Sequence, residues 1–143
     1  MADLVSVEQA IFARLRSELS DVTVERFVGE PIDAAEEAGR KVRGSTGVVL
    51  LLYGGTTLVE RPSYNSRRRQ SAWTMVVAAR NLRTDAEAQA AALVLLERVI
   101  AAMDNVGLPT DSDPQLTYSG DRLIAVADHV AAYETLWELA ING

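Results

Sequence analysis

Apolar residues recur every three or four positions over the first twenty residues, the spacing that gathers side chains on one side of an α-helix. The residues that form this stripe are Val7, Ala10, Ile11, Phe12, Leu15 and Leu19. Ser6, with Gln9 three residues later, predicts a capping box at the start of the helix. Residues 22–28 then alternate β-branched with other side chains, which predicts a strand that ends at Gly29 and Pro31.

The middle of the chain predicts two further strands and a short helix before them. Residues 32–42 are rich in alanine and charge and permit the helix. Residues 47–53, GVVLLLY, are apolar on both faces, as in a central strand that is covered on each side. Residues 71–80 alternate between two apolar faces and predict the next strand. Because residues 54–70 between them contain glycines, a proline, an asparagine and four arginines, we expect a long basic loop there.

The second half of the chain begins with the longest predicted helix. Thr84 and Glu87 form another capping box, and residues 88–103 have a broad apolar stripe. A polar linker follows. The last predicted elements are short strands over residues 116–118, 123–127 and 130–141.

This order of elements predicts the fold class. Strands joined by loops rather than by helices favour an antiparallel or mixed sheet, with two main helices packed on one face, in an α+β arrangement. A chain of 143 residues is long enough to bury one sufficient core. We therefore expect one domain over residues 1–143, without internal repeats.

The sequence offers little chemistry. It has no cysteine, which excludes disulfides and thiolate sites, and its single histidine, His129, predicts a surface or interface residue. The paired carboxylates Asp111 with Asp113 and Glu36 with Glu37 fit a solvated loop and a helix face. We expect no catalytic residue, no cofactor, no metal site and no enzymatic activity; a small hydrolase that uses His129 is the most remote alternative.

Charge is unevenly distributed along the chain. The net charge is −6, yet four arginines and no acid lie between residues 61 and 69. With an aromatic side chain among them, they are the candidate interface residues: Arg61, Tyr64, Arg67, Arg68 and Arg69. Such a group can be a solvated loop, a contact with an acidic protein surface, or a contact with nucleic acid phosphates. An overall acidic charge is unusual for a free-standing nucleic-acid binder.

The longest apolar run is too short for a membrane span, and the first ten residues lack the features of a signal peptide. We therefore expect no membrane contact and synthesis in the cytoplasm.

Several segments together resemble a family of small tail proteins of Mu-like phages and prophages, of the tail terminator type. They span nearly the whole chain, except residues 56–70. The matching segments are VEQAIFARL, VERFVGEP, GVVLLLYGG, TMVVAARNLR, AEAQAAALVLLERVIAAM and YETLWELAI, of which AARNLR is the most distinctive.

The resemblance implies a structural role in the virion tail, with assembly in the host cytoplasm. Subunits would form a ring, expected to be a homo-hexamer, that caps the tail tube protein and joins it to the neck or connector protein. DNA would pass through the lumen without specific binding. Acidic residues that repel phosphates are candidates for the lumen: Asp111, Asp113, Glu134 and Glu138. The alternatives are another tail-completion or head-tail connector protein, or a nucleic-acid-binding accessory protein.

Overall fold

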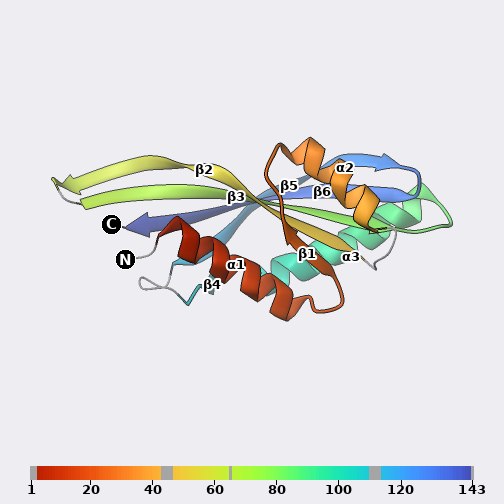
Figure 1. The fold of residues 1–143 in the computed structure, drawn as a ribbon, viewed down its shortest axis with the longest axis horizontal. Coiled ribbons are helices and arrows are strands. Elements are labelled where there is room, and N and C mark those ends of the chain that lie inside the picture. Colours follow the sequence, from red (N-terminus) through yellow and green to blue (C-terminus); the bar gives the residue numbers. More distant parts are fainter. Residues whose placement is uncertain (1–2, 43–46, 65, 110–113, 143) are drawn as a thin grey trace.

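The computed structural model describes residues 3–42, 47–64, 66–109 and 114–142, which form a mixed sheet with helices on both faces (Figure 1). The elements are α1 (Leu4–Glu18), β1 (Thr23–Arg26), α2 (Pro31–Lys41), β2 (Val48–Ser63), β3 (Ser66–Arg80), α3 (Asp85–Met103), β4 (Val106–Gly107), β5 (Gln115–Ala127) and β6 (Val130–Asn142). The strand order is β1-β2-β3-β6-β5-β4. β1 is parallel to β2, and the other neighbours are antiparallel. The predicted α+β class is confirmed.

Each face of the sheet has its own core. α1 and α3 pack on one face, named here the α3 face, where Leu15 and Val99 meet strand residues such as Met75. The shorter α2 packs on the other, the α2 face, over Leu50 and Val76. The expectation of two main helices on one face is therefore correct, and β2 is apolar on both sides because both cores need it.

The two long helices begin differently from one another. The Thr84 hydroxyl accepts a hydrogen bond from the Glu87 amide at 3.0 Å, which confirms the predicted cap of α3. The predicted start of α1 at Ser6 is wrong. Asp3 is the N-cap, and its carboxylate accepts from the Ser6 amide at 2.7 Å, which also lowers the pKa of Asp3. Because Asp3 already satisfies this free amide, the helix starts earlier.

Two tryptophans lie side by side on neighbouring strands, on the α3 face of the sheet. Trp73 of β3 and Trp137 of β6 are register partners, and each is 1% exposed. The Trp73 indole N–H donates to Ser71 at 2.9 Å, and the Trp137 indole N–H donates to Thr135 at 2.7 Å. Each hydroxyl in turn donates to a carbonyl on the opposite strand, Leu139 at 3.2 Å and Met75 at 3.1 Å. The pair is thus packed and fully hydrogen-bonded in the core.

An ion pair ties α3 to the turn between α1 and β1. The Arg98 guanidinium donates two hydrogen bonds to the Asp21 carboxylate, at 2.6 and 3.1 Å. These bonds lower the pKa of Asp21 below its ordinary value of 3.8. Since the folded-state pKa is the lower one, the stabilisation is complete above the unfolded pKa and is lost as the pH falls through the folded pKa.

We predict that Asp21→Asn is less stable than the wild-type chain at neutral pH and that this difference disappears in acid. The comparison is the midpoint of urea unfolding by circular dichroism, at pH 7 and at roughly pH 2. Glu97→Gln, which removes an exposed carboxylate beside Arg98 on α3, is the matched control. A gap between Asp21→Asn and wild type that persists in acid would show that the carboxylate charge is not the cause.

The predicted long basic loop over residues 54–70 is wrong. β2 and β3 remain paired far beyond Gly55, from Thr56 opposite Ser71 to Ser63 opposite Ser66, with bulges that absorb the irregular positions. The threonines and valine of this segment suit a strand, and pairing with a neighbour outweighs the breakers around them. The predicted strands 116–118 and 123–127 likewise join through bulges into β5.

Candidate assembly surface

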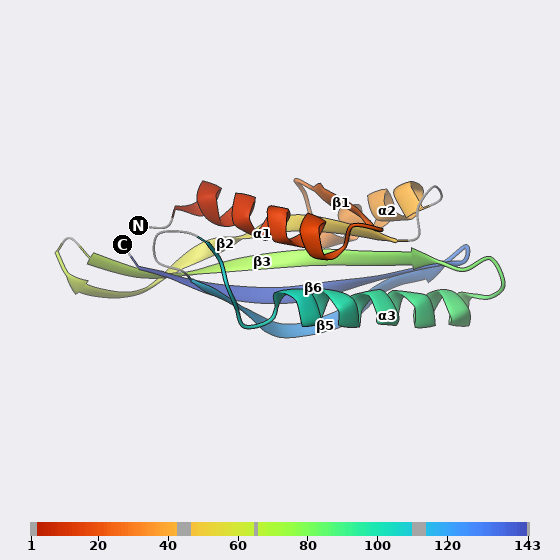
Figure 2. The same ribbon diagram turned by 90° about the horizontal axis from the view of Figure 1, so that it is seen from below.

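The end of the β2 and β3 hairpin, named here the arm, comprises residues 56–63 and 66–70. Both views show it projecting along the long axis of the molecule past the helices, and the turn between β5 and β6 lies at the opposite end (Figures 1 and 2). Among the described strands, only β6 pairs with the arm, along β3, where Asn142 is opposite Arg68. The arm is therefore a ribbon that leaves most of its surface open.

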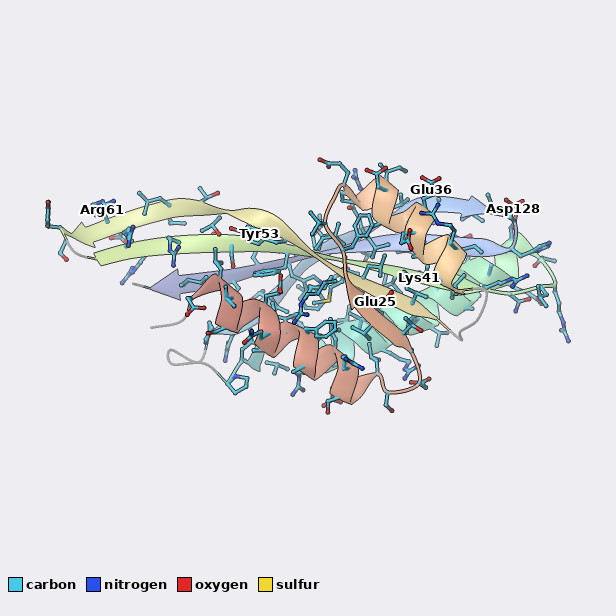
Figure 3. The ribbon with its side chains drawn as sticks, viewed as in Figure 1. Glu25, Glu36, Lys41, Tyr53, Arg61 and Asp128 are labelled. Carbon is cyan, nitrogen blue, oxygen red and sulfur yellow. The ribbon has the colours of Figure 1, made fainter. Side chains whose placement is uncertain are left out.

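The candidate arginines all lie on the arm, but in different settings. Arg68 pairs with Glu60 at 2.9 Å, on neighbouring strands. Arg61 lies at the far end of the arm (Figure 3) and donates to the Tyr64 carbonyl at 3.3 Å. Arg67 is exposed, and Arg69 is half-buried. The buried Arg69 Nε has no hydrogen-bond partner among the described residues. Four cations against Glu60 leave the arm strongly basic.

Apolar side chains are exposed beside these cations. Leu58 is 51% exposed and Tyr64 is 91% exposed, and Val59 is also open to solvent. A surface that combines arginine, tyrosine and aliphatic groups is typical of a contact region rather than of a solvated turn.

The outer edge of β2 is free along the arm. β1 pairs with Val48 to Leu51 only, and the Phe27 amide adds one bond to the Leu51 carbonyl. From Leu52 onward no described strand covers this edge. Free backbone amides and carbonyls on a sheet edge are a template for another strand.

The outer edge of β5 is free as well. β4 pairs only with Gln115 and Leu116, and the Tyr118 amide donates to the Asp104 carboxylate at 3.0 Å. Beyond Tyr118, no described strand lies outside β5. The Tyr118 hydroxyl donates to Asp121, which raises the pKa of Tyr118 to about 12 and fixes the carboxylate on this edge. Within the described residues, the sheet therefore has a free stretch on each of its two outer edges.

The candidate lumen acids differ in their exposure. Glu138 is exposed and accepts a hydrogen bond from Gln70 at 2.7 Å. Glu134 is 2% exposed and is paired with Arg122 of β5, so it is not a free surface charge of the kind expected for a lumen residue. Asp111 and Asp113 lie outside the described residues.

A groove of about 630 Å³ separates α2 from the last two strands. Figure 3 shows Glu36 and Asp128 at this end of the molecule, away from the arm. The residues that line this groove are mostly small and apolar, and Glu36 among them is paired with Arg40 at 3.8 Å. This arrangement holds no nucleophile and base within reach of each other.

His129 lies in the turn after β5 with a left-handed φ of 66°. Its backbone amide donates to Asp85 at 2.8 Å, and its ring Nδ1 is 4.0 Å from the same carboxylate. Within the described ranges, three or more potential ligands nowhere gather into a metal site. No helix in those ranges has the length and apolarity to cross a bilayer.

Sequence reasoning located the arginines but missed both free edges. The β-branched residues at 56, 57 and 59 were the available signal for strand in the arm. No local signal marks an edge, because strand order depends on pairings between distant segments.

No family model and no curated protein sequence matches this chain. Among solved structures, 40 chains match. One, from a structure described as "Virion of native gene transfer agent (GTA) particle", is 10% identical and has a TM-score of 0.60. The alignment covers 96% of this chain and 95% of that chain. The two proteins share a fold over almost all of both chains.

Proposed function

We propose that this chain is a structural protein of a phage-like particle, and that its copies form a ring of the tail terminator type. The observation that supports this most directly is the sheet with two different free edges, one of them extended by a basic arm. Two unlike surfaces on one molecule can join head-to-tail, and such contacts form a ring when the rotation from copy to copy closes.

The fold shared with a chain of the gene transfer agent virion and the sequence resemblance to tail terminators support the same role. In it, the ring caps the tail tube protein, joins it to the neck or connector protein and lets DNA pass. The exposed Glu138 suits a surface that DNA passes without binding, because carboxylates repel phosphates. The arm docks on an acidic surface of the neighbouring subunit or of the tube.

The proposal predicts that the purified chain forms closed rings and that these rings arrest the growth of tail tubes. Negative-stain microscopy and native mass spectrometry would give the ring and its order, with six copies expected. Tube length would then be measured with and without the protein, and with an unrelated acidic protein as control. A chain that stays monomeric at high concentration and leaves tube length unchanged would refute the proposal.

A nucleic-acid-binding accessory role is the second candidate, favoured by the exposed Arg61, Arg67 and Tyr64 at the end of the arm. Phosphate contacts and base stacking would use these side chains. Against it, Arg68 is already paired with Glu60, and the net charge is −6. The acidic body would repel a nucleic acid longer than the arm.

A further inference from the structure

We infer that neighbouring copies join by strand pairing, with the free edge of β2 on one copy adding to the free edge of β5 on the next. This inference rests on the proposed ring and specifies its contact. The contact makes one sheet continuous from copy to copy. Three properties of the two edges support it: the directions of the strands, the faces on which their side chains lie, and their charges.

The directions of the strands suit such pairing. β2 is antiparallel to β3, β3 to β6 and β6 to β5, so β2 and β5 run in opposite directions within a copy. A second copy placed alongside in the same orientation therefore brings its β2 antiparallel to β5 of the first. Antiparallel is the more stable way to join two strands.

Both edge strands contain a short run that pairs regularly with its inner neighbour, and a bulge lies at each end of this run. In β2, register shifts lie before Gly55 and after Leu58. In β5, they lie before Gly120 and after Leu123. Bulges bend an edge and discourage pairing there, so residues 55–58 and 120–123 are the segments that can form a ladder.

The two runs present matching side chains on the α3 face. Leu58 lies on that face, next to Arg69 and then Ile141 of the core. Leu123 lies on it too, next to Tyr133, and is 45% exposed. Joined edges would cover both exposed leucines and keep the faces of the sheet continuous.

Charges on the same face are complementary. Arg69 is beside Leu58, and its Nε has no hydrogen-bond partner among the described residues. Asp121 is two residues before Leu123 and is exposed. Pairing would bring the arginine of one copy near the carboxylate of the next, at an edge where the backbone also gains hydrogen bonds.

The edges lie at different levels along the sheet. Leu58 is opposite Arg69 of β3, which is opposite Ile141 of β6. Leu123 is instead opposite Tyr133 of β6. These levels differ by eight residues of β6, roughly 26 Å at ~3.3 Å per residue. Neighbouring copies must therefore be offset along the strands, which also brings the arm of one copy alongside the body of the next.

Cysteine crosslinking can test the contact cleanly because the chain has no cysteine of its own. Leu58→Cys and Leu123→Cys are combined in one chain and treated with a short bismaleimide. Such a reagent reaches both facing and diagonal positions, roughly 5 to 8 Å apart. We expect a ladder of covalent multimers beyond the dimer, because every copy has one partner on each side. Either single variant should give almost no product.

Two further variants control the experiment. Leu58→Cys with Leu82→Cys places the second thiol on an exposed residue before α3, off the β5 edge, and should give no ladder. Leu58→Cys with Asp121→Cys tests the register two residues away, should Leu123→Cys disturb the fold. Circular dichroism establishes that each variant is folded.

The outcomes separate the contact from the ring. Intact rings in native mass spectrometry, with no ladder from either edge pair, overturn strand pairing and leave the proposed function standing. Complete dimers from Leu58→Cys alone overturn it too, since they show a twofold contact between arms. A ladder without closed rings supports the pairing and counts against the ring.

Discussion

Trp137→Ala should lower the stability of the fold by about 3–5 kcal/mol, the usual cost of removing a large aromatic side chain from a core. Trp137 is 1% exposed, lies opposite Trp73 of the neighbouring strand and packs on Tyr118, whose ring centroid is 5.5 Å away. The loss also leaves the Thr135 hydroxyl without its indole donor. Against a total stability of about 5–15 kcal/mol, this is a large fraction.

The measurement is chemical and thermal unfolding followed by far-ultraviolet circular dichroism, which does not depend on tryptophan fluorescence. The midpoint temperature should fall on the order of 10 °C or more. Leu136→Ala, on the adjacent exposed position of β6, is the matched control and should change stability little. Trp137→Phe keeps most of the apolar area and should lie between the two. Equal stabilities for Trp137→Ala and Leu136→Ala would contradict the central role of the pair.

Removing the end of the arm should weaken ring formation at least tenfold while leaving the fold intact. The change replaces residues 59–68 by Asn-Gly, so that a two-residue turn closes the register pair of Leu58 and Arg69. The arm packs on no helix core, and its loss should therefore cost little stability. Assembly should weaken at least tenfold, about 1.4 kcal/mol, because the exposed arginines and apolar groups at the end of the arm, which would lie alongside the body of the next copy, are gone. Leu58 and Arg69 at the base of the arm remain.

Analytical ultracentrifugation over a range of concentrations would measure this weakening. A milder variant keeps the arm and changes Arg61→Ser and Arg67→Ser, two exposed cations for which no ion pair is seen within the described residues. Arg83→Ser, an exposed arginine between β3 and α3, is its control. Rings of normal stability from the shortened chain would show that the arm has another purpose.

Local patterns were sufficient wherever one face of an element meets a core. The alternation in residues 71–80 correctly predicted that Trp73 and Met75 share one face of the strand, and this face packs against α3. The two-sided apolar run of β2 correctly predicted cover on both sides. Thr84 was found as a cap because its partner is only three residues away. In each case the deciding interaction is close in sequence or repeats with the period of the element.

Prediction failed where partners are distant in sequence. Glu134 occupies an outward position by alternation, yet Arg122 of β5 lies opposite it and the carboxylate is buried. The arm was mistaken for a loop because its proline and arginines are typical of loops, while pairing with β3 decides its conformation. Of the candidate site, the arginines could be found by composition, but the edges required the strand order.

The difference in level between the free edges of β2 and β5 has a consequence for the shape of a closed assembly. If each copy is displaced along the strands relative to the one before it, the assembly can close only when the strands are tilted relative to the ring axis, as in any closed sheet. The ring would then be shorter along its axis than the full length of β2. The arms would run around its circumference rather than parallel to its axis. Each subunit would therefore overlap the next one along the circumference of the ring.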